Sequence, residues 1–141
     1  MTHFASALPA LPPEMTVLER GWLSANNIVF RGADNRLDGG AAVVDTGYCT
    51  HAAQTVALIG AALQGQPLER IFNTHLHSDH CGGNAALQAA WPGVRTAVPP
   101  GHLAQVQGWD AYALSYTPTG QQCPRFRADA ALLPGTEVRL G

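Results

Sequence analysis

Apolar and polar positions along the chain form short blocks whose period changes repeatedly, which predicts strands that alternate with helices. Short apolar or β-branched runs bounded by glycine, proline or polar residues predict strands within 15–31 (two, joined by a turn at 24–27), at 41–44, 68–73 and 94–98, and from 136 onward. Helical spacing predicts helices from Thr50, as N-cap, to Leu63, from Gly82 and Gly83 to about Trp91, and from His102 to about Leu114. Loops are expected at 32–40 and 116–127. This alternation predicts a layered α/β domain.

Length and composition indicate one soluble globular domain. The 141 residues are 46% hydrophobic and 13% charged, which excludes a disordered or fibrous chain. Residues 1–14, which contain three prolines, are expected to form a flexible lead-in, and residues 15–141 the domain. Neither a signal peptide nor an apolar run near the roughly 20 residues of a membrane span is apparent. We therefore expect a cytoplasmic protein without a membrane partner.

Charge and cysteine content narrow the function classes further. The net charge is -2, and the eight basic residues, all arginine, form no run, which argues against a nucleic-acid partner. Cys49, Cys81 and Cys123 are odd in number and widely spaced, so they predict neither a disulfide framework nor a structural zinc knuckle. A reducing compartment is expected.

The stretch from residue 73 to 84 carries most of the candidate chemistry. His75 and His77 are two apart, so an extended backbone would place their rings on one side, about 7 Å apart at the backbone, within reach of one ion. Asp79 and His80 are adjacent, so they converge on a second ion only if the chain turns there, and Gly82 and Gly83 would permit such a turn. Four ligand-type side chains at a strand-to-helix junction favour a metal site over a solvated polar loop.

Imidazole and carboxylate donors suit Zn²⁺ and, less selectively, iron, manganese or cobalt. The absence of a thiolate-rich set argues for an open catalytic site rather than a closed structural one. Metals in such a site lower the pKa of bound water to about 7 and polarise a carbonyl or phosphoryl oxygen. Asp79 is the expected catalytic carboxylate, which would orient the resulting hydroxide.

The pattern His-x-His-x-Asp-His followed by Gly-Gly resembles the signature of the metallo-β-lactamase superfamily of hydrolases. The run ending in Asp45-Thr46-Gly47 is similar to the strand that precedes this signature, and the order of elements agrees over about residues 15–141. The resemblance implies an αβ/βα sandwich with metals at one edge. It assigns His75 and His77 to the first metal, and Asp79 and His80 to the second.

The same resemblance implies that this chain is the N-terminal lobe alone. Family members complete their metal sites with two more histidines and a bridging aspartate from later segments, and with a second lobe that the sequence is expected to lack. Two histidines alone would hold zinc weakly. His51 and His102 are the other candidates for a ligand, but each is interpreted as a surface histidine near a helix start.

Several single residues have two interpretations. Asp45 would support the metal loop by a hydrogen bond or would cap its own turn, and the family likeness favours support. Cys81 is interpreted as a small packed side chain, and Asn84 as a helix cap rather than a substrate contact. The remaining candidates would line the entrance to the site or would simply pack or be solvated: Trp109, Tyr112, Tyr116, Phe126, Arg125 and Arg127.

The leading hypothesis is a zinc hydrolase of a small-molecule ester, thioester, lactone or amide, in which metal-bound hydroxide attacks the carbonyl. The alternative is an inert or partner-dependent lobe, because a half-sandwich would expose an apolar sheet face and favour a homo-oligomer or binding to a missing lobe. A third possibility implied by the resemblance is a mononuclear iron oxygenase acting on persulfides, which metal identity would separate from the hydrolases.

Overall fold

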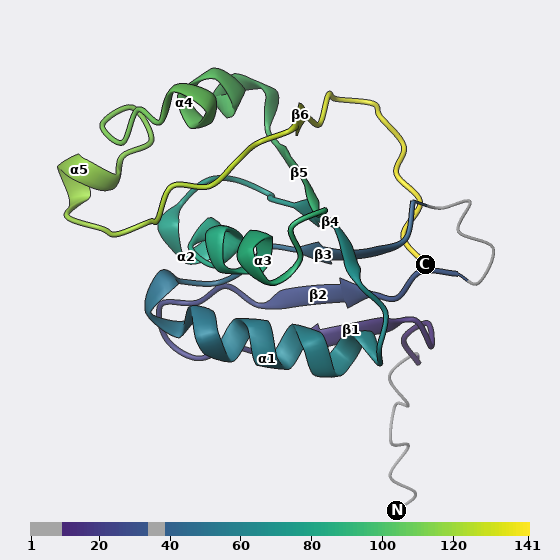
Figure 1. The fold of residues 1–141 in the computed structure, drawn as a ribbon. Coiled ribbons are helices and arrows are strands. Elements are labelled where there is room, and N and C mark those ends of the chain that lie inside the picture. The colour runs from purple at the N-terminus through teal and green to yellow at the C-terminus, as the bar shows by residue number, and fades with distance from the viewer. Residues whose placement is uncertain (1–9, 34–38) are drawn as a thin grey trace, which may run out of the picture.

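One six-stranded sheet forms the centre of the molecule (Figure 1). The computed structural model describes residues 10–33 and 39–141. Its strands are β1 (Met15–Leu18), β2 (Asn27–Phe30), β3 (Ala41–Val44), β4 (Leu68–Phe72), β5 (Arg95–Val98) and β6 (Ala130–Ala131). They lie in the sheet in chain order, β1 to β6. The pairs β1–β2 and β2–β3 are antiparallel, whereas β3–β4, β4–β5 and β5–β6 are parallel.

Helices fill the connections between the parallel strands, as such crossovers require. The helical elements are η1 (Cys49–His51), α1 (Ala52–Leu63), α2 (Ser78–Cys81), α3 (Asn84–Ala90), η2 (Pro100–His102), α4 (Leu103–Gly108) and α5 (Tyr116–Thr119). α1 and α3 lie against the same face of the sheet (Figure 1). Among the described residues, no helix has the length and apolar character needed to span a membrane.

The core lies between these two helices and the sheet. Val29, Val43 and Ile71, from three adjacent strands, are fully buried against Ile59 of α1 and Leu87 of α3, among others. A second apolar cluster joins α4 and α5 to the end of β5 and includes Val98, Val106, Tyr116 and Phe126. The histidine-bearing segment packs against the second cluster, because Leu76 and Cys81 are members of it.

One row of residues on the opposite face of the sheet is apolar and incompletely covered. The strand register aligns one residue from each strand in a row, and every member is apolar: Val17, Ile28, Val44, Phe72, Ala97 and Ala130. None of the six is fully buried, and Val17 is 38% exposed. In the neighbouring row, Val29, Val43 and Ile71 are by contrast fully buried. Within the described residues, this row is therefore only partly covered.

The predicted elements up to residue 98 are confirmed with small changes. Thr50 is not the N-cap of α1: the chain enters through the turn η1, and His51 occupies the cap position without a side-chain bond. The Ser24 hydroxyl instead accepts the Tyr48 N–H at 3.1 Å, so a loop distant in sequence stabilises this entrance. The predicted lead-in lies outside the described residues over 1–9, and near its end the carbonyl oxygen of Pro13 accepts a hydrogen bond from Arg31.

The predictions after residue 98 need correction. α4 ends at Gly108, well short of Leu114, because Trp109 adopts φ 50° and its ring contacts Tyr116 and Phe126. The predicted loop at 116–127 contains the short helix α5.

The strand predicted from residue 136 is wrong. The chain pairs with β5 earlier, at Ala130–Ala131. The carboxylate of Asp129 accepts the Thr96 N–H at 2.8 Å and aligns the two strands there. A turn at Pro134 and Gly135 follows the pairing.

Candidate metal-binding site

The three clustered histidines follow β4 at the carboxyl end of the parallel strands. His75 lies in the connection that leaves β4, His77 immediately precedes α2, and His80 lies within α2. The turn needed to bring Asp79 and His80 round is present, because residues 78–81 form one helical turn. The imidazole of His75 lies 4.8 Å from that of His77 and 3.8 Å from that of His80, measured between ring centroids. The sequence neighbours are thus also neighbours in space.

Asp45 braces this loop from the end of β3. It adopts φ 59°, a left-handed conformation that aspartate tolerates better than most residues, and its side chain is almost fully buried. Its carboxylate accepts the N–H and the hydroxyl of Thr74, at 2.9 and 2.6 Å. It also pairs with Nδ1 of His80 at 2.8 Å. With that nitrogen protonated, His80 keeps a lone pair on Nε2.

Backbone bonds hold α2 against the same loops. The carbonyl oxygen of His80 accepts the Thr46 N–H at 2.8 Å, and the carbonyl oxygen of Asp79 accepts the Ala25 N–H at 2.9 Å. Asn84 is not a helix cap as predicted. Its buried side chain accepts from the Thr46 hydroxyl at 2.7 Å and donates to Asn73 at 2.7 Å, so it links the ends of β3 and β4.

The glycines after α2 allow close contact between these segments. Gly82 and Gly83 have negative φ, so the need for glycine is one of space. A Cβ atom on Gly82 would lie 2.5 Å from the amide nitrogen of Cys49, and one on Gly83 would overlap the carbonyl oxygen of Thr46. The sequence predicts a turn at these glycines, whereas the structure shows that they let α2 touch the loop that follows β3.

The side chains of the cluster are of the kinds that bind a metal, but their rings lie too close together to hold one without rotating. Within residues 10–33 and 39–141, no three His, Cys, Asp or Glu side chains are already disposed to hold an ion. The 3.8 Å between the rings of His75 and His80 explains this, because zinc–nitrogen bonds of about 2.0–2.1 Å to two rings would set them further apart. His77 is exposed and His75 half-buried, so both have room to rotate. Three imidazoles and the Asp79 carboxylate therefore fit zinc in chemistry and proximity, after rotation of side chains.

The electrostatics of the cluster favour a neutral imidazole at His75. Burial, and then the neighbouring His80 and His77, lower the pKa of His75 below its ordinary value of 6.5. A neutral imidazole is the form that binds metals.

This shift predicts a pH dependence. Because the folded protein disfavours protonation of His75, this residue's contribution to stability is complete above pH 6.5 and is lost as the pH falls through its folded-state pKa. An NMR titration of the metal-free protein is expected to give His75 a midpoint below 6.5. A midpoint at or above that value would contradict the packing described for the rings.

A cavity adjoins the cluster on one side. It has a volume of about 230 Å³ and is lined by His77, Ser78 and Asp79 on one wall and by residues 114–116, 119 and 121 on the other. Asp79 Oδ2 lies 3.6 Å from Nε2 of His80, and its side chain is 40% exposed. The Ser78 hydroxyl donates to the Gln121 side chain and so joins the two walls. Tyr116 was a candidate to line the entrance, whereas Gln121 and the other contributors from this segment were missed because its sequence predicts only a loop.

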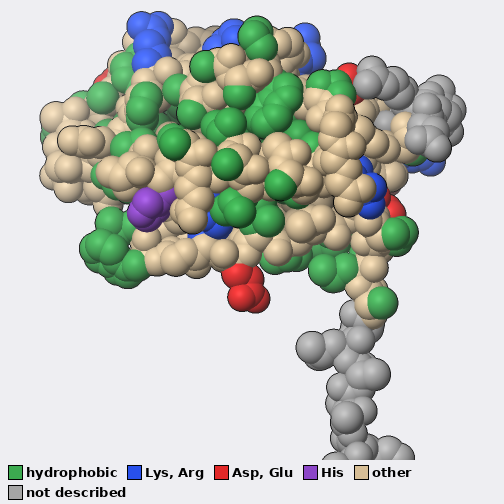
Figure 2. All heavy atoms as spheres, turned by 60° about the horizontal axis from the view of Figure 1, so that its bottom comes forward, with side chains coloured by type: hydrophobic (Ala, Val, Ile, Leu, Met, Phe, Trp, Pro, Cys, Tyr) green, Lys and Arg blue, Asp and Glu red, His purple; other side chains and the backbone are tan. Residues whose placement is uncertain are grey.

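The two other candidate ligands, His51 and His102, lie outside the histidine cluster. His51 hydrogen-bonds to Ser24 at 2.9 Å and lines a separate hollow of about 490 Å³ with Arg20 and Trp22. Figure 2 shows a histidine side chain exposed toward the left of one face, whereas hydrophobic side chains are spread across that face and basic side chains lie at several separate places. His102 ends η2, and within the described residues it has no ring contact with the cluster.

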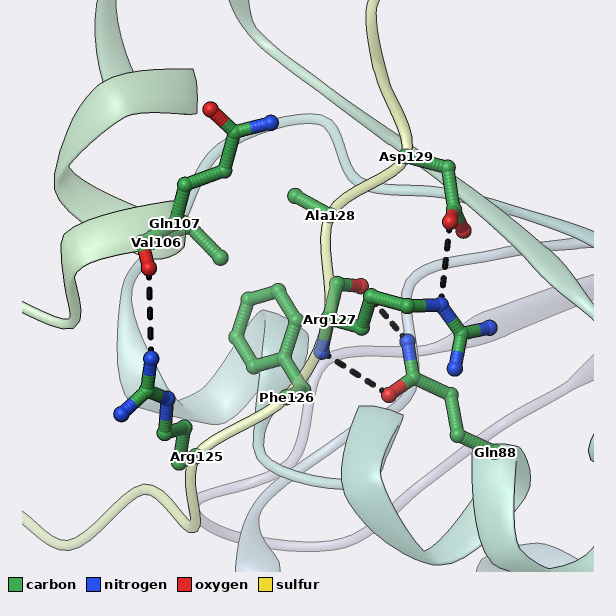
Figure 3. A pocket seen from close by; sticks show the side chains of 8 residues that line it. All are labelled: Gln88, Val106, Gln107, Arg125, Phe126, Arg127, Ala128 and Asp129. Carbon is green, nitrogen blue, oxygen red and sulfur yellow. Dashed lines mark hydrogen bonds and ion pairs between the residues drawn. The ribbon is translucent and has the colours of Figure 1, made fainter.

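Arg125 and Arg127 line a different hollow, of about 600 Å³ (Figure 3). Arg125 donates to the carbonyl oxygen of Gln107 at 3.2 Å, and Arg127 pairs with Asp129 at 2.9 Å. The hollow is not lined by any residue of the histidine cluster. Among the aromatic candidates, Tyr116 and Phe126 are buried, whereas Tyr112 is exposed. Of these three, Tyr116 lines the cavity beside His77.

The model of the metallo-beta-lactamase superfamily matches residues 20–140. The chain is 45% identical over 75 residues to a hydroxyacylglutathione hydrolase of Stenotrophomonas maltophilia, an alignment that covers 53% of this chain and 26% of that protein.

Solved structures give the same fold. A metallo-beta-lactamase from Cronobacter sakazakii superposes with a TM-score of 0.70 at 24% identity, covering 94% of this chain and 50% of that one. A subclass B3 metallo-beta-lactamase of Bradyrhizobium japonicum gives 0.62 at 22% identity, covering 82% and 42%. The chain thus spans about half the length of these structures and about a quarter of the hydrolase.

Proposed function

Because the chain belongs to the metallo-beta-lactamase superfamily, we propose that it supplies the metal-binding loop of a zinc-dependent hydrolase acting on an ester, thioester, lactone or amide of a small molecule. One observation carries this proposal: three imidazoles and a carboxylate lie together beside a cavity, with Asp45 bracing their loop. The similarity to a hydroxyacylglutathione hydrolase favours a thioester among these substrates.

Different side chains would bind the metal, orient the attacking water and contact the substrate. The metal would be held by His75, His77, His80 and Asp79. Asp45 would keep the His80 ring turned so that Nε2 faces the metal. The Asp79 carboxylate, exposed at the cavity wall, would orient and deprotonate the attacking water. Bound zinc would supply a Lewis acid and promote ionisation of water near neutral pH. Gln121 on the opposite wall would contact the substrate.

The partly covered apolar row of the sheet favours a second candidate, in which the chain by itself is inert and needs a partner. An apolar row across all six strands favours association, either with a second copy or with a further lobe. Activity of the monomeric 141-residue chain on a generic ester, abolished by a chelator, would eliminate this candidate.

Metal content tests the main proposal directly. We expect the purified chain, incubated with zinc, to bind the ion, and His77→Ala to bind it at least about a hundredfold more weakly, because loss of a direct ligand exceeds the effect of losing a residue that only supports one. Equilibrium dialysis with elemental analysis measures both. His102→Ala, a histidine outside the cluster, is the matched control and is expected to bind as the wild type does.

Two results would count against the assignment: equal losses in the two variants, or no zinc uptake by the wild type. Preference for iron over zinc under the same conditions would favour the oxygenase instead.

A further inference from the structure

The three cysteines gather beside the histidine loop although they are far apart in the sequence. Cys49 begins η1, Cys81 ends α2, and Cys123 lies between α5 and β6. The Sγ atoms of Cys81 and Cys123 are 3.9 Å apart. Cys49 donates to the carbonyl oxygen of Gln122 at 3.4 Å, which places it beside the residue that precedes Cys123. The sequence spacing gave no indication of this cluster.

The two facing thiols differ in exposure. Cys81 is fully buried and lies 3.1 Å from the Tyr116 hydroxyl, which in turn donates to the carbonyl oxygen of Leu76. Cys123 is half-buried and, together with Cys49, lines a hollow of about 460 Å³. A small oxidant can therefore reach the Cys123 thiol, whereas the Cys81 thiol is accessible only from Cys123.

Hydrogen bonding supports the same order. The bond from Cys81 is the main reason that the pKa of the Cys123 thiol lies below its ordinary value. The thiolate is the reactive form of cysteine, so Cys123 has more of the nucleophile at neutral pH than an ordinary thiol.

We propose that Cys81 and Cys123 are a modification site that forms a reversible disulfide with a small disulfide oxidant such as oxidised glutathione. The Cys123 thiolate attacks one sulfur of the oxidant, whose S–S bond breaks to release one glutathione thiolate, which takes up the proton lost from Cys123. The Cys81 sulfur then attacks the Cys123 sulfur of the mixed disulfide and releases the second glutathione, which takes up the proton lost from Cys81. Two protein thiols are oxidised and one glutathione disulfide is reduced to two thiols.

The bond would fasten one wall of the cavity to the other. A disulfide is about 2.05 Å long, so the two sulfurs must approach by about 1.9 Å from their separation of 3.9 Å. Packing opposes rotation of the Cys123 side chain least, because it lines an open hollow. Cys81 directly follows His80, and Gln121 already hydrogen-bonds to Ser78. The bridge would therefore fix residues 121–123 on the helical turn that carries the candidate ligands.

The experiment uses the metal-free, fully reduced 141-residue chain incubated with oxidised glutathione. Thiol titration is expected to fall from three free cysteines to one, and peptide mass spectrometry is expected to find Cys81 joined to Cys123. Cys49→Ser is the matched control and should form the same bridge. Cys123→Ser should form no bridge between protein thiols, with circular dichroism showing that it remains folded.

Dithiothreitol should restore all three thiols of the wild type. A bridge between Cys49 and Cys123, a stable mixed disulfide that never transfers to Cys81, or three thiols that stay reduced would each overturn the proposal. None of these readouts depends on zinc binding or hydrolysis.

Discussion

Asp45→Asn is expected to weaken zinc binding by about ten- to a hundredfold while the chain remains folded. Asparagine keeps the shape of aspartate and tolerates the left-handed backbone at this position. It loses the negative charge that pairs with Nδ1 of His80 at 2.8 Å, and its NH₂ group cannot accept, so one carbonyl oxygen cannot receive all three bonds that Thr74 and His80 donate. The His80 ring is then free to turn, so Nε2 is no longer held toward the ion. Competition with a chromophoric chelator measures the affinity.

Asp129→Asn is the matched control for this experiment. Asp129 also accepts a backbone N–H, that of Thr96, and also pairs with a cation, Arg127. It has no contact with the histidine loop among its described bonds. We expect this variant to lose some stability but to bind zinc as the wild type does. Equal zinc affinities for the two variants would show that the brace at Asp45 has no role in metal binding.

Gly83→Ala is expected to lower the free energy of unfolding by about 3 kcal/mol. The new methyl group would overlap the carbonyl oxygen of Thr46, and the obstacle is backbone that cannot rotate aside. Relief would require α3 to move away from the end of β3, which breaks the buried bond between Asn84 and Thr46. Urea denaturation followed by circular dichroism gives the loss directly.

Gly93→Ala separates crowding from the general effect of replacing glycine. Gly93 lies in the turn before β5, and a Cβ atom there would meet nothing within 4 Å. We expect its unfolding free energy to stay within about 0.5 kcal/mol of the wild type. If Gly83→Ala proved equally mild, the tight approach of α2 and α3 to the β3 loop would be incorrect.

Local pattern was enough to predict the first part of the fold. The apolar run at 41–44 and the helical spacing from Ala52 to Leu63 each have one strong period, and both elements appear where expected. After Val98 the pattern weakens and tertiary contacts decide. Trp109 ends its helix because its ring packs on Tyr116 and Phe126, and β6 forms where Asp129 meets Thr96. Neither contact leaves a signal in sequence spacing.

The candidate site divides in the same way. The spacing of His75, His77 and His80 indicated that their rings would lie together, and they do. Asp45 was singled out, although its contact with His80 spans 35 positions. The second wall of the cavity was predicted only in part: Tyr116 was a candidate to line the entrance, whereas Gln121 reaches the loop only through the path taken by the chain after α4.

The chain-order arrangement of the strands has a consequence for biosynthesis. Each strand finds its neighbour among residues that have already left the ribosome, so the sheet can grow from its amino-terminal edge during translation. Asp45 would be in position before the histidines emerge and could receive His80 at once. Tyr116 and Cys123 arrive last, so the completed cavity is a late product of folding.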